Sequence, residues 1–191
     1  MFSIDPGAKY IGIVIFLDDY YLNSHTVFDK AALITTVKDY VNSLQKSNQN
    51  LIELIFKFGR GVPPITNDLI NKIYKIFKSR GKLKIYLIDE SKSSKIKAYE
   101  NKRKIPKHEA SALFLSFRNG VEVNKKHIQK ALNHLKPNML KKENSIIENL
   151  ENSNDIIMLS EIAEKVLNGE LSLSESTEMF RNVKMQNQKN F

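Results

Sequence analysis

The sequence predicts an α/β domain: a mixed five-stranded sheet flanked by helices, followed by an all-helical C-terminal extension. Short apolar segments rich in β-branched residues fill residues 2–27, and strand-like and helix-like segments alternate over residues 29–118. Alternation of this kind implies parallel pairing through right-handed crossovers, here attached to an antiparallel meander. From about residue 122 the pattern is wholly helical. We therefore expect an α/β domain over residues 1–120 and a helical extension over residues 121–191.

The meander is expected to consist of strands at residues 2–4, 10–17 and 20–27. Asp5-Pro6-Gly7 is a strong turn signal after the first strand, and Asp18-Asp19 provides a hairpin turn. The second strand, YIGIVIFL, is apolar at nearly every position, which predicts burial on both of its faces.

The alternating part is expected to add two strands and three helices. The predicted elements are a helix at 29–44, a strand at 51–58, a helix at 67–78, a strand at 83–88 and a helix from Pro106 to about Arg118. In the extension, Pro137 divides a first helix from a second, Asn168-Gly169 ends the next, and Ser172-Leu173-Ser174-Glu175 forms a capping box.

Composition excludes several classes of site. Cysteine is absent, so neither disulfides nor a thiolate zinc site can form, and four scattered histidines argue against a histidine-rich metal cage. No uncharged apolar run reaches the roughly 18 residues that a membrane helix needs. The chain enters a strand-like segment at once, which leaves no room for a signal peptide and favours a cytoplasmic setting without membrane contact.

The net charge of +9 is unevenly distributed. Residues 143–191 hold four basic and nine acidic residues, a formal charge of −5, so residues 1–142 carry +14. A strongly cationic body suits phosphate binding, because neutralised phosphates release their counterions. The alternative is that lysine merely solvates the surface, since net charge bears on solubility as well as on binding.

Polar residues that suit metal chemistry follow three separate elements. Asp5 lies at the carboxyl end of the first strand, Glu90 follows the fifth, and His108 and Glu109 begin the next helix. Sites in open α/β sheets gather beyond the carboxyl ends of strands, and carboxylates hold hard cations such as Mg²⁺. Each residue also has a plain alternative: a tight turn at Asp5, a solvated strand end at Glu90, and an acid near a helix N-terminus at Glu109.

Basic residues, most of them on loops, are expected at the same edge, where they would contact a nucleic-acid backbone. They are Lys9, Lys57, Arg60, Lys92, Lys95, Lys102, Arg103, Lys104 and Lys107. The glycine of the Asp5-Pro6-Gly7 turn would let an anion approach the backbone, and Tyr99 could stack on a base.

Three segments together resemble a family. The run Asp5-Pro6-Gly7-Ala8-Lys9-Tyr10-Ile11-Gly12 resembles the Asp-x-Gly-x-x-x-x-Gly opening of RNase H-like proteins of the RuvC and YqgF types, which include Holliday junction resolvases. The run Ile88-Asp89-Glu90-Ser91 resembles their Asp-Glu-Arg segment, and the run His108-Glu109-Ala110-Ser111-Ala112-Leu113 resembles the helix that supplies the last ligands. The resemblance covers about residues 1–120.

This resemblance implies an RNase H-like fold and a metal-dependent endonuclease that acts on branched DNA or structured RNA. Asp5, Glu90 and His108 would bind Mg²⁺ or Mn²⁺, and Glu109 would complete the catalytic set. Two positions depart from the family pattern: Lys57 stands on the fourth strand where a catalytic glutamate is expected, and Ser111 replaces an acid. Lys57 would lie between Asp5 and Glu90, where it would replace one metal ion or mark the loss of catalysis.

Other functions remain open at this stage. The chain could be a nucleic-acid-binding module that keeps the fold without catalysis, or an interaction scaffold whose acidic helices form a homodimer or cover the cationic face. An actin-like phosphotransferase also opens with Asp-x-Gly, but it usually needs two copies of the sheet, for which 191 residues are too few.

Overall fold

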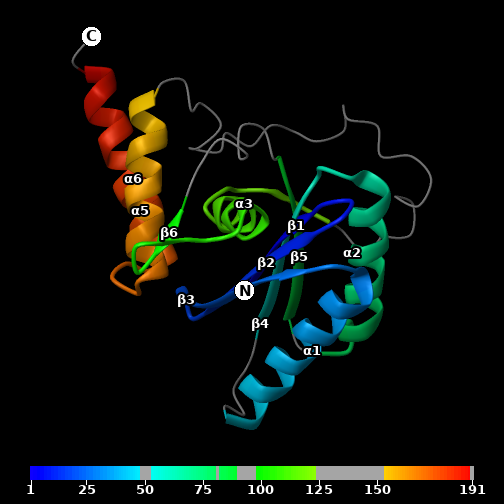
Figure 1. The fold of residues 1–191 in the computed structure, drawn as a ribbon. Helices are drawn as coiled ribbons and strands as arrows, with labels where there is room; N and C mark the ends of the chain where they lie inside the picture. The colour runs from blue at the N-terminus through cyan, green and yellow to red at the C-terminus, as the bar shows by residue number, and fades with distance from the viewer. Residues whose placement is uncertain (48–52, 81, 90–97, 124–152, 190–191) are drawn as a thin grey trace.

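The computed structural model describes residues 1–47, 53–80, 82–89, 98–123 and 153–189. It is an α/β structure on a mixed sheet with the strand order β3-β2-β1-β4-β5-β8, and a separate two-stranded hairpin, β6–β7 (Figure 1). The strands are β1 (Phe2–Pro6), β2 (Ile11–Leu17), β3 (Tyr20–Val27), β4 (Glu53–Gly59), β5 (Lys82–Ile88), β6 (Tyr99–Glu100), β7 (Arg103–Lys104) and β8 (Val121–Glu122). The helices are α1 (Lys30–Ser47), α2 (Pro63–Phe77), α3 (Lys107–Ser116), α5 (Ser153–Leu167) and α6 (Leu173–Lys189).

The strand pairing follows the predicted combination of a meander with parallel crossovers. β1 pairs antiparallel with β2 and parallel with β4, β2 pairs antiparallel with β3, and β4 pairs parallel with β5. The predicted number of five strands is one too few, because β8 pairs antiparallel with β5 and adds a sixth. The expectation that the chain is wholly helical from about residue 122 is wrong at its start for the same reason. Two residues are too short to show a strand pattern in the sequence.

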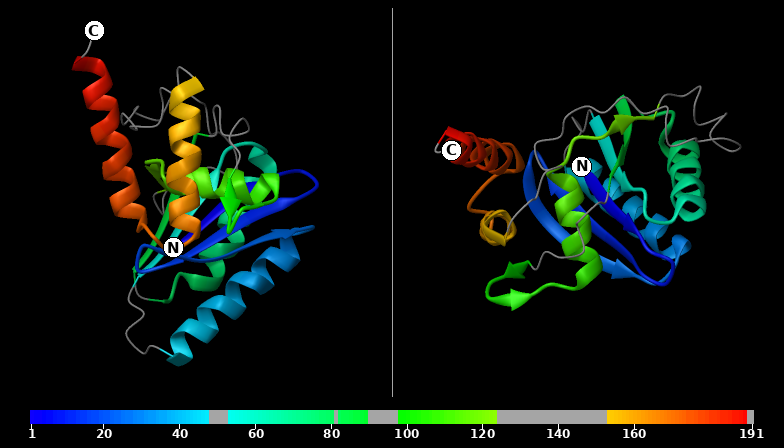
Figure 2. Two further views of the ribbon diagram at one scale, coloured as in Figure 1. Left: turned by 60° about the vertical axis from the view of Figure 1, so that its left-hand side comes forward. Right: turned by 90° about the horizontal axis from the view of Figure 1, so that it is seen from above.

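The central strands are buried on both faces, as the apolar second strand predicted. Phe2 and Ile4 of β1, with Ile11, Ile13 and Ile15 of β2, pack against the layer of α1 and α2. The alternate residues of β2, Val14 and Phe16, pack in a second cluster with α3. Because successive side chains of a strand point to opposite faces of the sheet, β2 contributes residues to both hydrophobic clusters. Figure 2 shows α3 on the opposite face of the sheet from α1 and α2.

Two local predictions need correction. Helix α2 begins at Pro63, not near residue 67, because two successive prolines occupy its first turn, where a missing N–H costs nothing. The basic segment before α3 is a β-hairpin, β6–β7, whose turn residues Asn101 and Lys102 adopt φ values of 47° and 66°. The predicted break at Pro137 lies outside the described residues.

The C-terminal helices join the same hydrophobic cluster as α3 and β2, through Leu159 and Val166 of α5 and Phe180 of α6. The capping box is confirmed: the backbone N–H of Ser172 donates to Glu175 Oε2 over 2.8 Å, and that of Glu175 donates to Ser172 Oγ over 3.2 Å. The start of α6 is fixed to the β2–β3 turn, because the Leu173 N–H donates to the Asp19 carbonyl over 2.8 Å.

The predicted hairpin turn at Asp18-Asp19 is also confirmed, with φ values of 46° and 72°. The predicted end of α5 is confirmed as well, by Gly169 with a φ of 73°. Within the parts of the chain that the structure describes, no helix combines the length and the apolarity needed to cross a membrane.

Helix α3 approaches the sheet most closely at Gly12. A Cβ atom added at this glycine would lie 2.0 Å from the His108 carbonyl oxygen and 2.9 Å from the Glu109 nitrogen. These atoms belong to the backbone of the first turn of α3, so they cannot move aside as a flexible side chain can. The second glycine of the Asp-x-Gly-x-x-x-x-Gly pattern is therefore required by the packing of α3 on β2.

We predict that Gly12→Ala lowers the free energy of unfolding by about 3 kcal/mol or more, because α3 must move off the sheet to accept the methyl group. In a chain of this size the melting temperature should fall by about 6 °C or more. Gly169→Ala is the control: it meets no atom within 4 Å and should cost only about 1 kcal/mol for its positive φ. Equal melting temperatures for the two variants would contradict the packing argument.

Candidate functional site

Asp5 and His108 lie together at the end of the central strand. Asp5 lies on β1 and His108 in the first turn of α3, 103 residues later, and a 3.0 Å hydrogen bond joins Asp5 Oδ2 to His108 Nδ1. The Asp5 side chain is 13% exposed and that of His108 is 31% exposed, so solvent reaches the imidazole more readily than the carboxylate. Burial raises the pKa of Asp5 above its ordinary value, although the hydrogen bond and the charge of His108 oppose this change.

The polarity of this pair follows from hydrogen-bonding rules. If the neutral imidazole carries its proton on Nδ1, that N–H donates to the carboxylate and Nε2 is left as an acceptor. An acceptor of this kind can bind a cation or take a proton from water.

Gly7 does not have the role that the sequence suggested. A Cβ atom at Gly7 would lie 2.3 Å from the Tyr10 carbonyl oxygen and 3.1 Å from Cε1 of His108. The space beside this glycine is thus filled by the chain itself, and the expectation that it would admit an anion is wrong. Its absent side chain makes room for the imidazole of His108.

Glu109 does not join Asp5. Its carboxylate is buried and accepts hydrogen bonds from two hydroxyl groups of β3: Thr26 Oγ1 donates to Oε1 over 2.8 Å, and Ser24 Oγ donates to Oε2. The expectation that Glu109 would complete the set around Asp5 is therefore wrong in its placement. A charged acceptor held by two hydroxyl donors fixes the start of α3 against the edge strand.

Lys57 also lies away from Asp5. It pairs with Ser3 on β1, and since Phe58 pairs with Ile4, the residue of β4 that comes next, beside Asp5, is Gly59. The Lys57 ammonium donates to the Ser116 carbonyl over 2.5 Å and to the Arg118 carbonyl over 2.8 Å, both at the C-terminal end of α3. Burial lowers the pKa of Lys57 to about 8. Strand β4 does lie between β1 and β5, as expected, but Lys57 lies two residues before the position beside Asp5, and its ammonium is bound at the other end of α3.

The predicted basic residues are spread over several places. Lys107 begins α3 and favours ionised Asp5 through its charge, and Lys9 lies 5.3 Å above the ring of Tyr10. Arg60 follows β4 and is partly exposed.

The β6–β7 hairpin carries three of the predicted basic residues, all exposed: Lys102, Arg103 and Lys104. A hydrogen bond from the Asn101 N–H to Asn168 Oδ1 holds this hairpin to the end of α5. Tyr99 pairs with Lys104 in this hairpin.

The predicted residues Glu90, Lys92 and Lys95 lie outside the described residues. Among the residues that are described, no three acidic or histidine side chains come close enough together to hold a metal ion. Asp5 and His108 are thus two potential ligands, an oxygen and a nitrogen. The buried carboxylate, whose pKa is raised by the loss of water, is a group that a nearby cation would stabilise in its ionised form.

Sequence reasoning missed an aromatic row beside this pair. The ring of Tyr10 lies 5.8 Å from the imidazole of His108 and 5.6 Å from the ring of Phe28, measured between centroids. Phe28 is 75% exposed, the highest fraction among the exposed large apolar side chains that the structure describes. An apolar residue directly after a strand gives no sign in the sequence of which way it faces, so this row could not be derived.

No protein-family model, no curated protein and no solved structure matches this chain.

We predict that Asp5→Asn stabilises the folded chain at pH 7. The pKa of Asp5 is raised by folding, so its favourable contribution is complete below its unfolded pKa and is lost as the pH rises through the folded pKa. The Asn amide carries no charge and still accepts a hydrogen bond from His108, so the variant does not lose stability as the pH rises. The melting temperature at pH 7 should rise, at about 2–4 °C for each kcal/mol.

The comparison should be repeated at about pH 3, below the ordinary pKa of Asp, where the carboxyl is protonated in both states and the gain should vanish. Asp39→Asn, an exposed change on α1, is the matched control and should leave the melting temperature unchanged at both pH values. A lower melting temperature for Asp5→Asn at pH 7 would contradict the assignment.

Proposed function

We propose that this chain is an RNase H-like protein that acts as a metal-dependent nuclease on structured nucleic acid, branched DNA or RNA. The observation that carries the proposal is the hydrogen-bonded pair of Asp5 and His108 at the end of the central strand. The strand order β3-β2-β1-β4-β5, with α3 lying across β1 and β2, supports an RNase H-like arrangement. Both residues of the pair belong to segments that resemble the RuvC and YqgF types.

The residues present suit a hard or borderline cation in part. Asp5 would supply one carboxylate oxygen, and we propose Glu90 as the second carboxylate ligand. His108 would stay outside the ligand set, because its Nδ1 is bonded to Asp5 and its Nε2 serves as the base. Carboxylate oxygens suit Mg²⁺ as well as Mn²⁺. When bound, the cation would supply positive charge against the phosphate that is cleaved.

The chain's own groups would orient and deprotonate the attacking water. Asp5 holds the imidazole through Nδ1 and favours the positive charge that His108 gains when Nε2 takes a proton. The water oxygen forms the new bond to phosphorus while its proton passes to Nε2, and the bond from phosphorus to the leaving oxygen breaks as that oxygen takes a proton from solvent water. Lys107, the basic residue whose charge acts on Asp5, would attract the scissile phosphate.

Nucleic acid is the substrate class that the surroundings of the pair favour. Residues 1–142 carry a formal charge of +14. Beside His108, the exposed ring of Phe28 offers a face on which an unpaired base could stack, and Lys9 lies over the neighbouring Tyr10. Structured substrates present such unpaired bases at junctions and loops.

A nucleic-acid-binding module without catalysis is the second candidate. It is favoured by the finding that the described residues bring only Asp5 and His108 together, with Glu109 committed to β3. The two candidates differ in one respect: binding without catalysis survives the removal of the Asp5 carboxylate, whereas cleavage does not.

We predict that the chain cleaves branched DNA or structured RNA with Mg²⁺ or Mn²⁺, and that Asp5→Asn lowers the rate by about 10²–10⁴-fold. The measurement is cleavage of labelled four-way junctions and hairpin RNAs, with affinity measured in parallel without metal. Asp39→Asn again serves as the control and should cleave at the wild-type rate. Cleavage that persists unchanged in Asp5→Asn would remove this pair from the mechanism, and binding without any cleavage would favour the second candidate.

We also predict that Phe28→Ala weakens binding of a single-stranded oligonucleotide by about 5-fold or more, because a stacked base contributes about 1–3 kcal/mol. Phe28→Tyr keeps the ring and should bind as the wild type does. Leu22→Ala removes another exposed apolar side chain, 42% exposed on β3, and should have no effect. An abasic oligonucleotide should bind wild type and Phe28→Ala equally, and a loss that is the same with and without bases would exclude stacking.

A further inference from the structure

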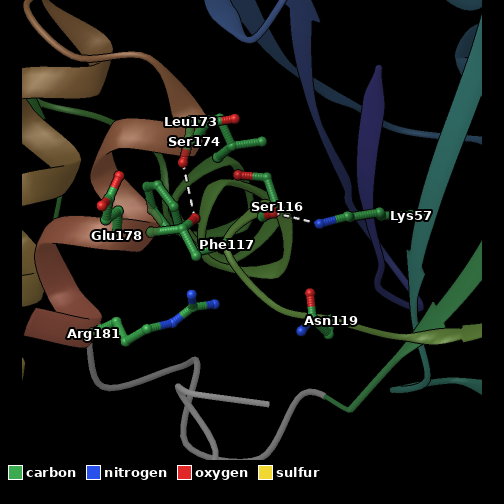
Figure 3. Close-up of a pocket in the computed structure, with 9 residues that line it drawn as sticks. Lys57, Ser116, Phe117, Asn119, Leu173, Ser174, Glu178 and Arg181 are labelled. Carbon is green, nitrogen blue, oxygen red and sulfur yellow. Dashed lines mark hydrogen bonds between the residues drawn. The ribbon is translucent and has the colours of Figure 1, made fainter. Parts of the chain in front are cut away.

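A pocket of about 510 Å³ lies between the C-terminal end of α3 and the N-terminal half of α6. It is separate from the candidate site, which is formed by Asp5 on β1 and His108 in the first turn of α3. Its walls come from β4, from α3 and the residues after it, and from α6 (Figure 3). The lining residues are Lys57, Ser116, Phe117, Asn119, Leu173, Ser174, Thr177, Glu178 and Arg181.

Nitrogen-bearing side chains line the pocket from three segments of the chain. In Figure 3 the Lys57 side chain enters from β4 with its ammonium directed at the Ser116 carbonyl, the Arg181 guanidinium extends from α6 on the other side of the end of α3, and Asn119 lies below Lys57. Lys57 has three N–H groups, of which two donate to the carbonyls of Ser116 and Arg118. One is left for a ligand. Within the described parts of the chain, no acidic group forms an ion pair with Lys57 or Arg181.

The hydroxyl groups in the wall already donate hydrogen bonds to other groups of the protein. Thr177 Oγ1 donates to the Leu173 carbonyl over 2.8 Å, Ser116 Oγ donates to the Leu113 carbonyl over 2.5 Å, and Ser174 Oγ donates to Asp19 Oδ2. The donors that remain are therefore those of Lys57, Asn119 and Arg181. Two of these three carry a positive charge, which selects an anionic acceptor.

We propose that this pocket binds a small phosphate monoester, with the phosphate between Lys57 and Arg181. A phosphate group has three terminal oxygens and can accept from three directions at once, whereas a carboxylate offers two oxygens in one plane. Phe117 and Leu173 supply an apolar wall for the rest of the ligand. The volume lies within the roughly 300–1,000 Å³ of pockets for small molecules, which suits a ligand of the size of a nucleoside monophosphate. Glu178, the acid in the wall, would face an amino or hydroxyl group of that ligand.

The test is a titration of the full chain followed by calorimetry and by the NMR signal of the Asn119 side-chain amide. The probes are inorganic phosphate, acetate and adenosine monophosphate. We expect saturable binding of the monophosphate with a dissociation constant of about 1 mM or tighter, weaker binding of phosphate and none of acetate. Absence of saturable binding for both phosphate compounds would overturn the proposal.

Arg181→Gln is the deciding variant, because Arg181 is exposed and its loss does not threaten the fold. It should weaken binding of the monophosphate about 10-fold or more, as expected for a charge-assisted hydrogen bond. Lys165→Gln removes the same charge from the exposed surface of α5, outside the pocket, and should bind as the wild type does. Equal losses for the two variants would show a general effect of charge and would reject the site.

A second arm separates a small ligand from the phosphates of a nucleic-acid strand. Adenosine monophosphate at saturation should leave the affinity for an oligonucleotide unchanged, and Arg181→Gln should affect only the monophosphate. Competition between the two would assign the pocket to the strand and would overturn the small-molecule assignment. Failure of nuclease activity leaves this measurement unaffected.

Discussion

The structure depends on the close docking of α3 on the face of the sheet. The helix approaches β2 so closely that its first turn lies over the bare Cα of Gly12. Small or hydroxyl-bearing residues occupy the facing positions, and Ser3 Oγ donates to the Ala112 carbonyl over 2.6 Å. Such contact brings His108 within hydrogen-bond distance of Asp5. Had residue 12 carried a Cβ, the helix would stand further off and this pair could not form at its present distance.

Charged side chains also compensate the two ends of this helix electrostatically. At the N-terminal end, where unpaired N–H groups give a positive end to the helix dipole, Glu109 is held as an acceptor by Ser24 and Thr26. At the C-terminal end, Lys57 donates to the carbonyls of Ser116 and Arg118. An acid at the start and a base at the end both oppose the dipole. Glu109 and Lys57 thus help to position α3, and the candidate chemistry is left to Asp5 and His108.

The sequence allowed most of the fold to be predicted, because apolar alternation and turn residues act locally. The strands of the meander, the Asp18-Asp19 turn and the capping box at Ser172 are all of this kind. What failed depends on contacts between distant segments. No local signal in the sequence shows that the two-residue strand β8 pairs with β5. Nor does any show that Glu109 points toward β3 while its neighbour His108 points toward Asp5. On a helix, adjacent side chains point about 100° apart, so one of two consecutive polar residues commonly leaves the site.

Lys57 shows that aligning a strand by sequence alone can misplace a residue by two positions along that strand. Counting along the fourth strand places a lysine near the expected acid, which invites the idea of an ammonium that replaces a metal ion. The register moves that residue beside Ser3, and the Lys57 side chain ends at the carbonyls of α3. An ammonium that already donates to two carbonyls cannot also neutralise carboxylates at the far end of the same helix. Lys57 is therefore evidence neither for nor against catalysis at Asp5. Among the described residues, Asp5 and His108 are the pair that could carry out chemistry at that edge of the sheet.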